Sequence, residues 1–136
     1  MSHYLRVYSD NVALLLHYQD VLEVGTWVAG ARIPREAVWR DENMPVISLA
    51  RILGRDSDDP RAYVVLDFDD QKLMLLVEQI NSLIDVEDQE FREVADRAFA
   101  SEVPVNEACY RESEDDIYWR LGGTALLEYQ RQSASS

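Results

Sequence analysis

The sequence predicts a mainly β protein built from two small sheets or partial barrels. An extended segment, a polar turn and an apolar extended segment follow one another within residues 4–16, and the same order returns within residues 62–77. This order is typical of β-hairpins. Each hairpin leads into a further apolar stretch, and long helices between the hairpins are not indicated. Two packed small sheets or two partial barrels therefore fit the pattern better than a parallel sheet.

The first hairpin joins a β-branched and aromatic segment, 4–8, to an apolar segment, 12–16, through Ser9-Asp10-Asn11. These turn residues are favoured because their side chains bond the local backbone. Residues 19–24 come next and fit either a helical turn or a further strand. Residues 79–86 follow the second hairpin in the same way.

The middle of the chain predicts an irregular connection, a short hairpin and a compact helix. The connection covers residues 25–35, and the hairpin covers 38–47 with its polar turn at 41–43. Residues 48–54 are predicted to be helical: Ser48 can cap the free N–H groups, and Gly54 suits the left-handed position after the last turn.

The C-terminal third combines further strands with short helical pieces. Residues 89–100 fit either a helix or a loop that packs two phenylalanines. Strands are predicted at 105–111 and 117–121, and a short helical turn follows Gly122-Gly123. We expect residues 131–136 to form a flexible tail.

Charge and composition narrow the classes of partner. Thirteen basic residues stand against 26 acidic ones, which gives a net charge of −13. A field of this sign disfavours nucleic acid and direct membrane binding, and otherwise provides solubility. The single cysteine, Cys109, excludes an internal disulfide. No signal peptide or membrane-spanning run is indicated, so we expect a cytoplasmic protein.

The inventory of reactive residues argues against an enzyme. His3 and His17 are the only histidines, and zinc sites need three or four ligands at fixed spacings. The acidic clusters near Asp58, Asp69 and Asp115 fall at predicted turns, where aspartate is favoured for conformational reasons. No serine lies in a nucleophile-elbow pattern. We therefore expect no catalytic centre, no metal and no cofactor.

Trp27 and Trp39 are candidates for a binding surface because they flank an irregular segment and a turn. Tryptophan is enriched at binding hot spots, yet aromatics in a small domain also fill its core. Both interpretations remain open for these two residues.

Several segments, in order, resemble the CheW-like chemotaxis coupling domain family over roughly residues 4–129. Val21-Leu22-Glu23-Val24 is similar to the family's V-x-E-[IV] segment. Met44-Pro45-Val46-Ile47-Ser48-Leu49 with Leu53-Gly54 resembles its P-V-[IV]-D-L stretch and following L-G, and Leu75-Leu76-Val77-Glu78 resembles its L-[LV]-V-D.

The chain departs from the family pattern just before the P-V stretch. The family carries N-L-R-G where this sequence has Val38-Trp39-Arg40-Asp41. Arg40 matches the family's arginine. Asp41 replaces the family's glycine and tolerates a positive φ less freely than glycine does. Ser48 replaces an aspartate and can cap a helix equally well. The segment between Glu23 and Pro45 is shorter than in typical members.

The resemblance implies one domain over 1–136, made of two intertwined five-stranded SH3-like β-barrel subdomains with a few short helices. We expect the subdomains to divide near residues 55–62. It also implies a non-catalytic adaptor that bridges the cytoplasmic tips of chemoreceptors to the regulatory domain of a CheA-type histidine kinase. A divergent structural or self-associating protein that has lost receptor coupling is the alternative.

The resemblance also implies site residues. Val21 and Arg40 fall where the family contacts receptors, in the groove between subdomains. Alternatively, Val21 packs in the core and Arg40 belongs to a solvated turn or a structural ion pair. Glu23, Trp39 and Glu78 are further candidate interaction residues.

Overall fold

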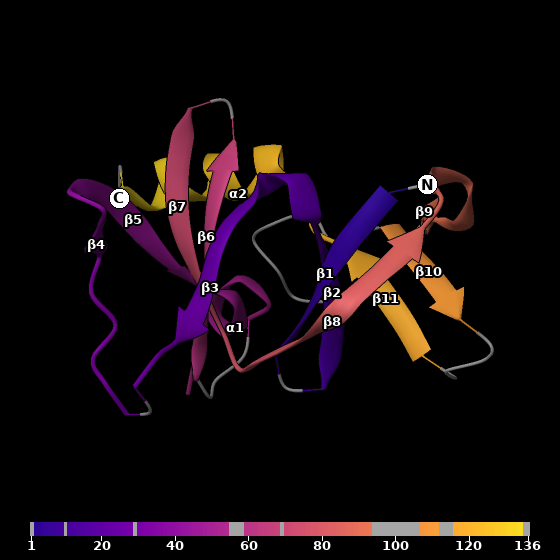
Figure 1. Cartoon of the computed structure of the whole chain (residues 1–136), viewed down its shortest axis with the longest axis horizontal. Helices are drawn as coiled ribbons and strands as arrows, with labels where there is room; N and C mark the ends of the chain where they lie inside the picture. The colour runs from indigo at the N-terminus through magenta and orange to yellow at the C-terminus, as the bar shows by residue number, and fades with distance from the viewer. Residues whose placement is uncertain are drawn as a thin grey trace.

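Two β-sheets lie beside one another in the computed structural model of the chain (Figure 1). The structure describes residues 2–9, 11–28, 30–54, 59–68, 70–93, 107–111 and 116–134. The mainly β fold class is confirmed. Among the described residues, no helix is long and apolar enough to cross a membrane.

The first sheet, called sheet A, combines the beginning of the chain with its C-terminal half. Its strand order is β8-β1-β2-β11-β10-β9. The bounds are β1 Ser2–Ser9, β2 Val12–His17, β8 Gln79–Val86, β9 Arg92–Glu93, β10 Glu107–Arg111 and β11 Asp116–Arg120. The β1–β2 hairpin confirms the first predicted hairpin, and Asn11 adopts a φ of 66° in its turn. β11 then pairs with β2 in parallel.

The second sheet, called sheet B, is formed by the middle of the chain. Its strand order is β3-β6-β7-β5-β4, so β3 and β4 are its edge strands. The bounds are β3 Val21–Thr26, β4 Glu36–Trp39, β5 Glu42–Ser48, β6 Ala62–Phe68 and β7 Gln71–Val77. The antiparallel β6–β7 pair is the second predicted hairpin, whereas β5 and β7 pair in parallel.

Short helices connect these strands. The 3-10 turn η1 (Tyr18–Asp20) leads from β2 into β3, so residues 19–24 contain both a helical turn and a strand. The helix α1 (Leu49–Ile52) follows β5, with the Ser48 side chain accepting a bond from the Arg51 N–H and Gly54 at a φ of 71°. Both predicted end signals of this helix are confirmed.

The main hydrophobic core lies between the two sheets. One face of each sheet contributes to it, including Leu14 from β2 and Leu75 from β7, which are both fully buried. The helix α2 (Gly123–Ala134) contributes Leu126 to the same cluster. The opposite face of each sheet carries a smaller cluster, centred on Tyr4 and Tyr118 in sheet A and on Met44 and Val65 in sheet B.

Sheet B extends across residues 55–62, where the subdomains were expected to divide. β3, β4 and β5 precede this segment and β6 and β7 follow it, yet all five belong to sheet B. The resemblance implied two intertwined subdomains. The first hairpin pairs with strands from the C-terminal half, because strand pairing follows the burial of apolar faces and not sequence order.

Three further details differ from the expected outline. Sheet A has a sixth strand, the two-residue β9. The 3-10 turn η2 (Asp88–Glu90) and β9 occupy the beginning of the segment 89–100, whose residues 94–100 lie outside the described part. Residues 131–134 of the expected flexible tail belong to α2, which is longer than the predicted helical turn.

Candidate functional site

A bulge in β3 gives Val21 and Glu23 different surroundings. Val21 pairs with Leu66, whereas Glu23 pairs with Val65, and the register shifts between these two positions. Leu66 belongs to the core between the sheets, and Val65 belongs to the cluster on the opposite face of sheet B. Bulges re-aim side chains in this way. Val21 therefore packs, half-buried, against the main core, while Glu23 faces the other side.

Glu23 is the acceptor of two hydrogen bonds at one carboxylate oxygen. The indole Nε1–H of Trp39 donates to Glu23 Oε2 at 2.7 Å, and the Tyr63 hydroxyl donates to the same oxygen at 2.9 Å. Since β3 and β4 are the edge strands, the Trp39–Glu23 bond joins the two edges of sheet B. It helps to close the curled sheet into a barrel.

The two bonds also change the acidity of the groups that form them. They lower the pKa of Glu23, chiefly through the Trp39 bond and then through the Tyr63 bond, because both donors favour the ionised carboxylate. The Glu23 carboxylate in turn raises the pKa of Tyr63, because it accepts the phenolic hydrogen and repels a phenolate. Glu23 is therefore held as a carboxylate at neutral pH.

Gly25 makes room for Tyr63. The two residues pair across β3 and β6, and a Cβ atom on Gly25 would lie 2.4 Å from the Tyr63 ring. A side chain at this position would therefore displace the ring. The absence of a Cβ lets the tyrosine lie over the strand and reach Glu23.

Arg40 lies in the tight turn between β4 and β5. Trp39 pairs with Glu42, so Arg40 and Asp41 form a two-residue loop, with φ values of 48° and 64°. Two successive positive φ values are typical of the type I′ hairpin, in which asparagine and glycine are the preferred residues. The Arg40 guanidinium lies 4.6 Å from the centroid of the Trp39 ring, in cation–π geometry. Lys72 on β7 pairs with Glu42 at 3.2 Å beside the same turn.

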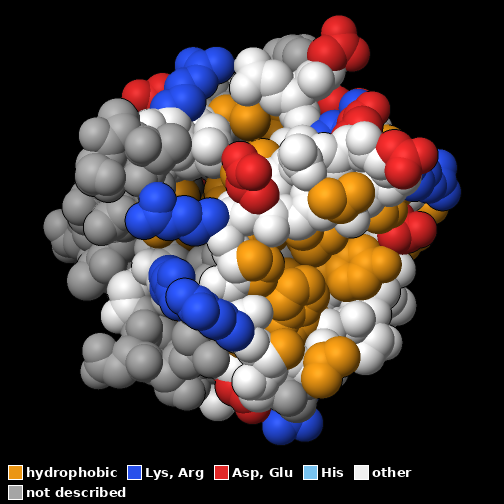
Figure 2. All heavy atoms as spheres, turned by 90° about the vertical axis from the view of Figure 1, so that its left-hand side faces the viewer, with side chains coloured by type: hydrophobic (Ala, Val, Ile, Leu, Met, Phe, Trp, Pro, Cys, Tyr) orange, Lys and Arg blue, Asp and Glu red, His pale blue; other side chains and the backbone are white. Residues whose placement is uncertain are grey.

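This hairpin borders an apolar surface. Trp27, Trp39 and Tyr63 are half-buried and pack on the Met44–Val65 cluster, so both tryptophans combine core packing with partial exposure. Val28 and Val38 are exposed at 72% and 69%. Figure 2 shows apolar side chains gathered on this side of the molecule, where β4 and β5 lie, with lysine and arginine side chains beside them.

The structure thus brings together three of the five predicted site residues: Glu23, Trp39 and Arg40. Val21 is two positions from Glu23 but packs toward the main core. Glu78 forms the bend between β7 and β8, and its N–H donates to the carbonyl of Tyr8 at 3.0 Å. Tyr63 was not predicted, because its place depends on the register of β6 against β3.

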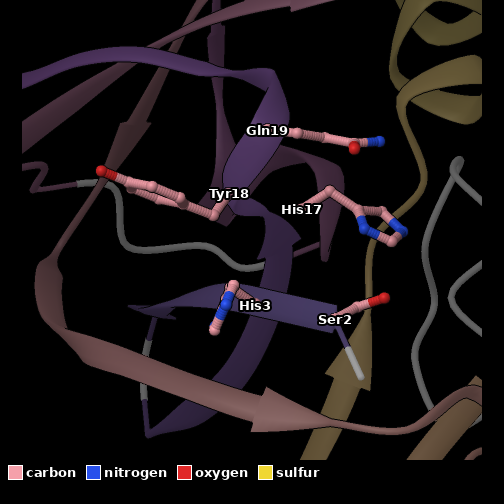
Figure 3. Close-up of a pocket in the computed structure, with 5 residues that line it drawn as sticks. All are labelled: Ser2, His3, His17, Tyr18 and Gln19. Atoms are coloured by element: carbon pink, nitrogen blue, oxygen red, sulfur yellow. The ribbon is translucent and has the colours of Figure 1, made fainter.

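A shallow hollow of about 270 Å³ lies on sheet A, and both histidines line it (Figure 3). The His17 ring packs against the Tyr4 ring with centroids 4.6 Å apart and the two planes tilted by 39°, and His3 pairs with Asp85. The two imidazoles point in different directions (Figure 3). Within the described part of the chain, no three histidine, cysteine or acidic side chains gather as a metal site would require.

The arrangement on sheet B suits recognition of another protein. It presents a guanidinium, held against an indole, next to half-buried aromatic side chains. A guanidinium can form paired bonds with a carboxylate, and aromatic side chains with arginine are typical of binding hot spots.

Comparisons with known proteins agree with this architecture. The model of the CheW-like domain family matches residues 7–115. The crystal structure of the scaffolding protein TtCheW from Thermoanaerobacter tengcongensis superimposes with a TM-score of 0.70 at 20% sequence identity, covering 90% of each chain. No curated protein sequence matches.

Proposed function

Because this chain belongs to the CheW-like domain family, we propose that it is a non-catalytic adaptor that couples chemoreceptors to a CheA-type histidine kinase. Members of the family are scaffolds of chemotactic signal transduction. In this role the protein works in the cytoplasm, is recruited to membrane-associated receptor arrays and requires no cofactor.

The observation that carries the proposal is the presentation of Arg40. The family resemblance assigns this arginine to receptor contact, and here it is exposed on a two-residue turn and stacked on Trp39. An exposed, oriented guanidinium can bind acidic side chains on a receptor tip even though the whole protein carries a net charge of −13. Arg32 and Arg35, also exposed, make the segment before β4 locally basic.

The replacement of the family's glycine by Asp41 does not remove the turn. Asp41 adopts a φ of 64°, which is the conformation that glycine would supply, and β4 and β5 pair up to Trp39 and Glu42. The hairpin therefore keeps a tight two-residue turn with Arg40 in it, despite the loss of the glycine. This supports the adaptor over the alternative of a structural protein that has lost receptor coupling.

Calorimetric titration against two separate partners tests the proposal: the kinase regulatory domain and a receptor cytoplasmic fragment. We expect both to bind, and Arg40→Glu to weaken receptor binding without loss of the fold. Arg61→Glu is the matched control, because Arg61 is an exposed arginine that precedes β6 and pairs with Asp59. Stable homo-oligomers with affinity for neither partner would support the self-associating alternative instead.

A further inference from the structure

We propose that Glu23, assisted by Tyr63, is a positioning residue that orients Arg40 for its partner through the indole ring of Trp39. This inference rests on the proposed function, since it assigns to Arg40 the contact with an acidic receptor group. It adds a chain of contacts that runs from the edge strand β3 to the tip of the β4–β5 hairpin.

The first step in this chain is the fixing of the indole ring. Trp39 is bonded at Nε1 to Glu23 at 2.7 Å, and Glu23 is itself held by Tyr63 at 2.9 Å. The Trp39 ring also packs on the Met44–Val65 cluster. The indole is therefore held by a hydrogen bond to β3 at its Nε1 atom and by packing of its ring on buried side chains. Both contacts restrict the motion of the ring.

The second step is the placement of the Arg40 guanidinium over the Trp39 ring. The Arg40 guanidinium carbon lies 4.6 Å from the Trp39 ring centroid. Arg40 itself adopts a φ of 48°, a backbone region that non-glycine residues rarely occupy. Residues held in sparsely populated conformations cluster at binding sites, where the surrounding contacts keep the geometry fixed.

The consequence concerns the entropy of binding. An arginine that is already stacked loses less rotational freedom when it contacts a partner. The family pattern has leucine at the position of Trp39, and leucine offers neither an indole N–H nor an aromatic face. The positioning device is therefore a feature of this chain's own residues.

A double-mutant cycle with a receptor cytoplasmic fragment measures whether Glu23 acts through Arg40. We expect Glu23→Ala to weaken binding about threefold to tenfold when Arg40 is present. The same substitution should change binding by less than about twofold in the Arg40→Ala background. Equal losses in both backgrounds would mean that Glu23 acts on the fold in general, and would overturn the proposal.

Other variants protect this test from artefacts. Glu23→Gln keeps the size of the side chain and a neutral acceptor, so it should fold normally and lose less affinity in the same direction. Glu36→Ala removes an equal charge from an exposed position on β4 and should leave affinity unchanged. Trp39→Leu, which installs the family's residue, should abolish the dependence on Glu23.

A measurement without any partner separates this inference from the proposed function. NMR relaxation of the Arg40 Nε–H group should show restricted motion in the natural protein and increased motion in Glu23→Ala. Unchanged Arg40 motion would overturn the positioning role even if the receptor binds. Absence of receptor binding by the natural protein would refute the adaptor function, while the relaxation result still decides the positioning role.

Discussion

The indole of Trp39 and the carboxylate of Glu23 join the two edge strands of sheet B through a 2.7 Å hydrogen bond. The bond closes one end of the curled sheet and brings together residues sixteen positions apart in the sequence. It also fixes the ring on which Arg40 stacks. The stability of this barrel and the presentation of the arginine are therefore physically linked.

This link predicts that the contribution of Glu23 to stability depends on pH. The pKa of Glu23 in the folded protein is below its ordinary value of 4.5, chiefly because of the Trp39 bond. The ionised Glu23 therefore contributes its full stabilisation when the pH is above the pKa of the unfolded state. This contribution is lost as the pH falls through the lower pKa of the folded state. Urea unfolding of the natural protein and Glu23→Gln should differ most near neutral pH and converge in acid. A difference that grows in acid would contradict the assignment.

The close approach of Gly25 and Tyr63 predicts that an added methyl group is poorly tolerated. In Gly25→Ala the new Cβ would lie 2.4 Å from the tyrosine ring, so the ring must move and its bond to Glu23 must weaken. We expect a loss of about 1–3 kcal/mol in the free energy of unfolding. Gly122→Ala is the control, because nothing lies within 4 Å of a Cβ there. Equal effects of the two substitutions would show that space at Gly25 is not limiting.

The backbone at Asp41 predicts a stabilising substitution. Its φ of 64° is costly for an aspartate and easily adopted by glycine. Asp41→Gly should therefore raise the free energy of unfolding by about 0.5–1 kcal/mol. Asn43→Gly, two residues later and within β5, should lower it instead, because glycine weakens a strand interior. Thermal unfolding of both variants measures whether their effects on stability have opposite signs. Destabilisation by Asp41→Gly would show that the aspartate backbone is not strained at this turn.

The core between the sheets predicts a large effect of truncation. Leu75 on β7 is fully buried in the cluster that both sheets share. Leu75→Ala should cost about 2–5 kcal/mol, since it removes apolar contact and leaves a cavity. Val28→Ala, at a side chain that is 72% exposed, should change stability by less than about 0.5 kcal/mol. A small effect at Leu75 would mean that the sheets do not depend on this shared cluster.

The sequence predicted elements that are specified by neighbouring residues. Ser48 and Gly54 mark the ends of α1 through local capping and a left-handed backbone, and both occur as expected. The turn of the first hairpin was likewise predicted from residues such as Asn11, which adopts the positive φ that suits such a turn. These features depend on a few adjacent side chains, which a single sequence displays.

Features that depend on distant pairing were not predictable in the same way. The pairing of β3 with β6 across residues 55–62 is one such feature. Tyr63 was missed for the same reason: only the register of β6 against β3 places it opposite Gly25 and beside Glu23. Arg40 was predicted from the resemblance, and Glu23 and Trp39 were predicted as separate interaction residues. The hydrogen bond between Glu23 and Trp39 could not be predicted, because it depends on how the two edges of sheet B approach each other.

Co-sedimentation of the kinase with receptor-bearing vesicles tests the adaptor role most directly. Kinase, receptor vesicles and this protein are mixed, and the kinase in the pellet is measured with and without the protein. We predict that the protein increases the sedimented kinase and that Arg40→Glu removes most of this increase, whereas Arg61→Glu does not. An equal amount of sedimented kinase with and without the protein would contradict its role as an adaptor.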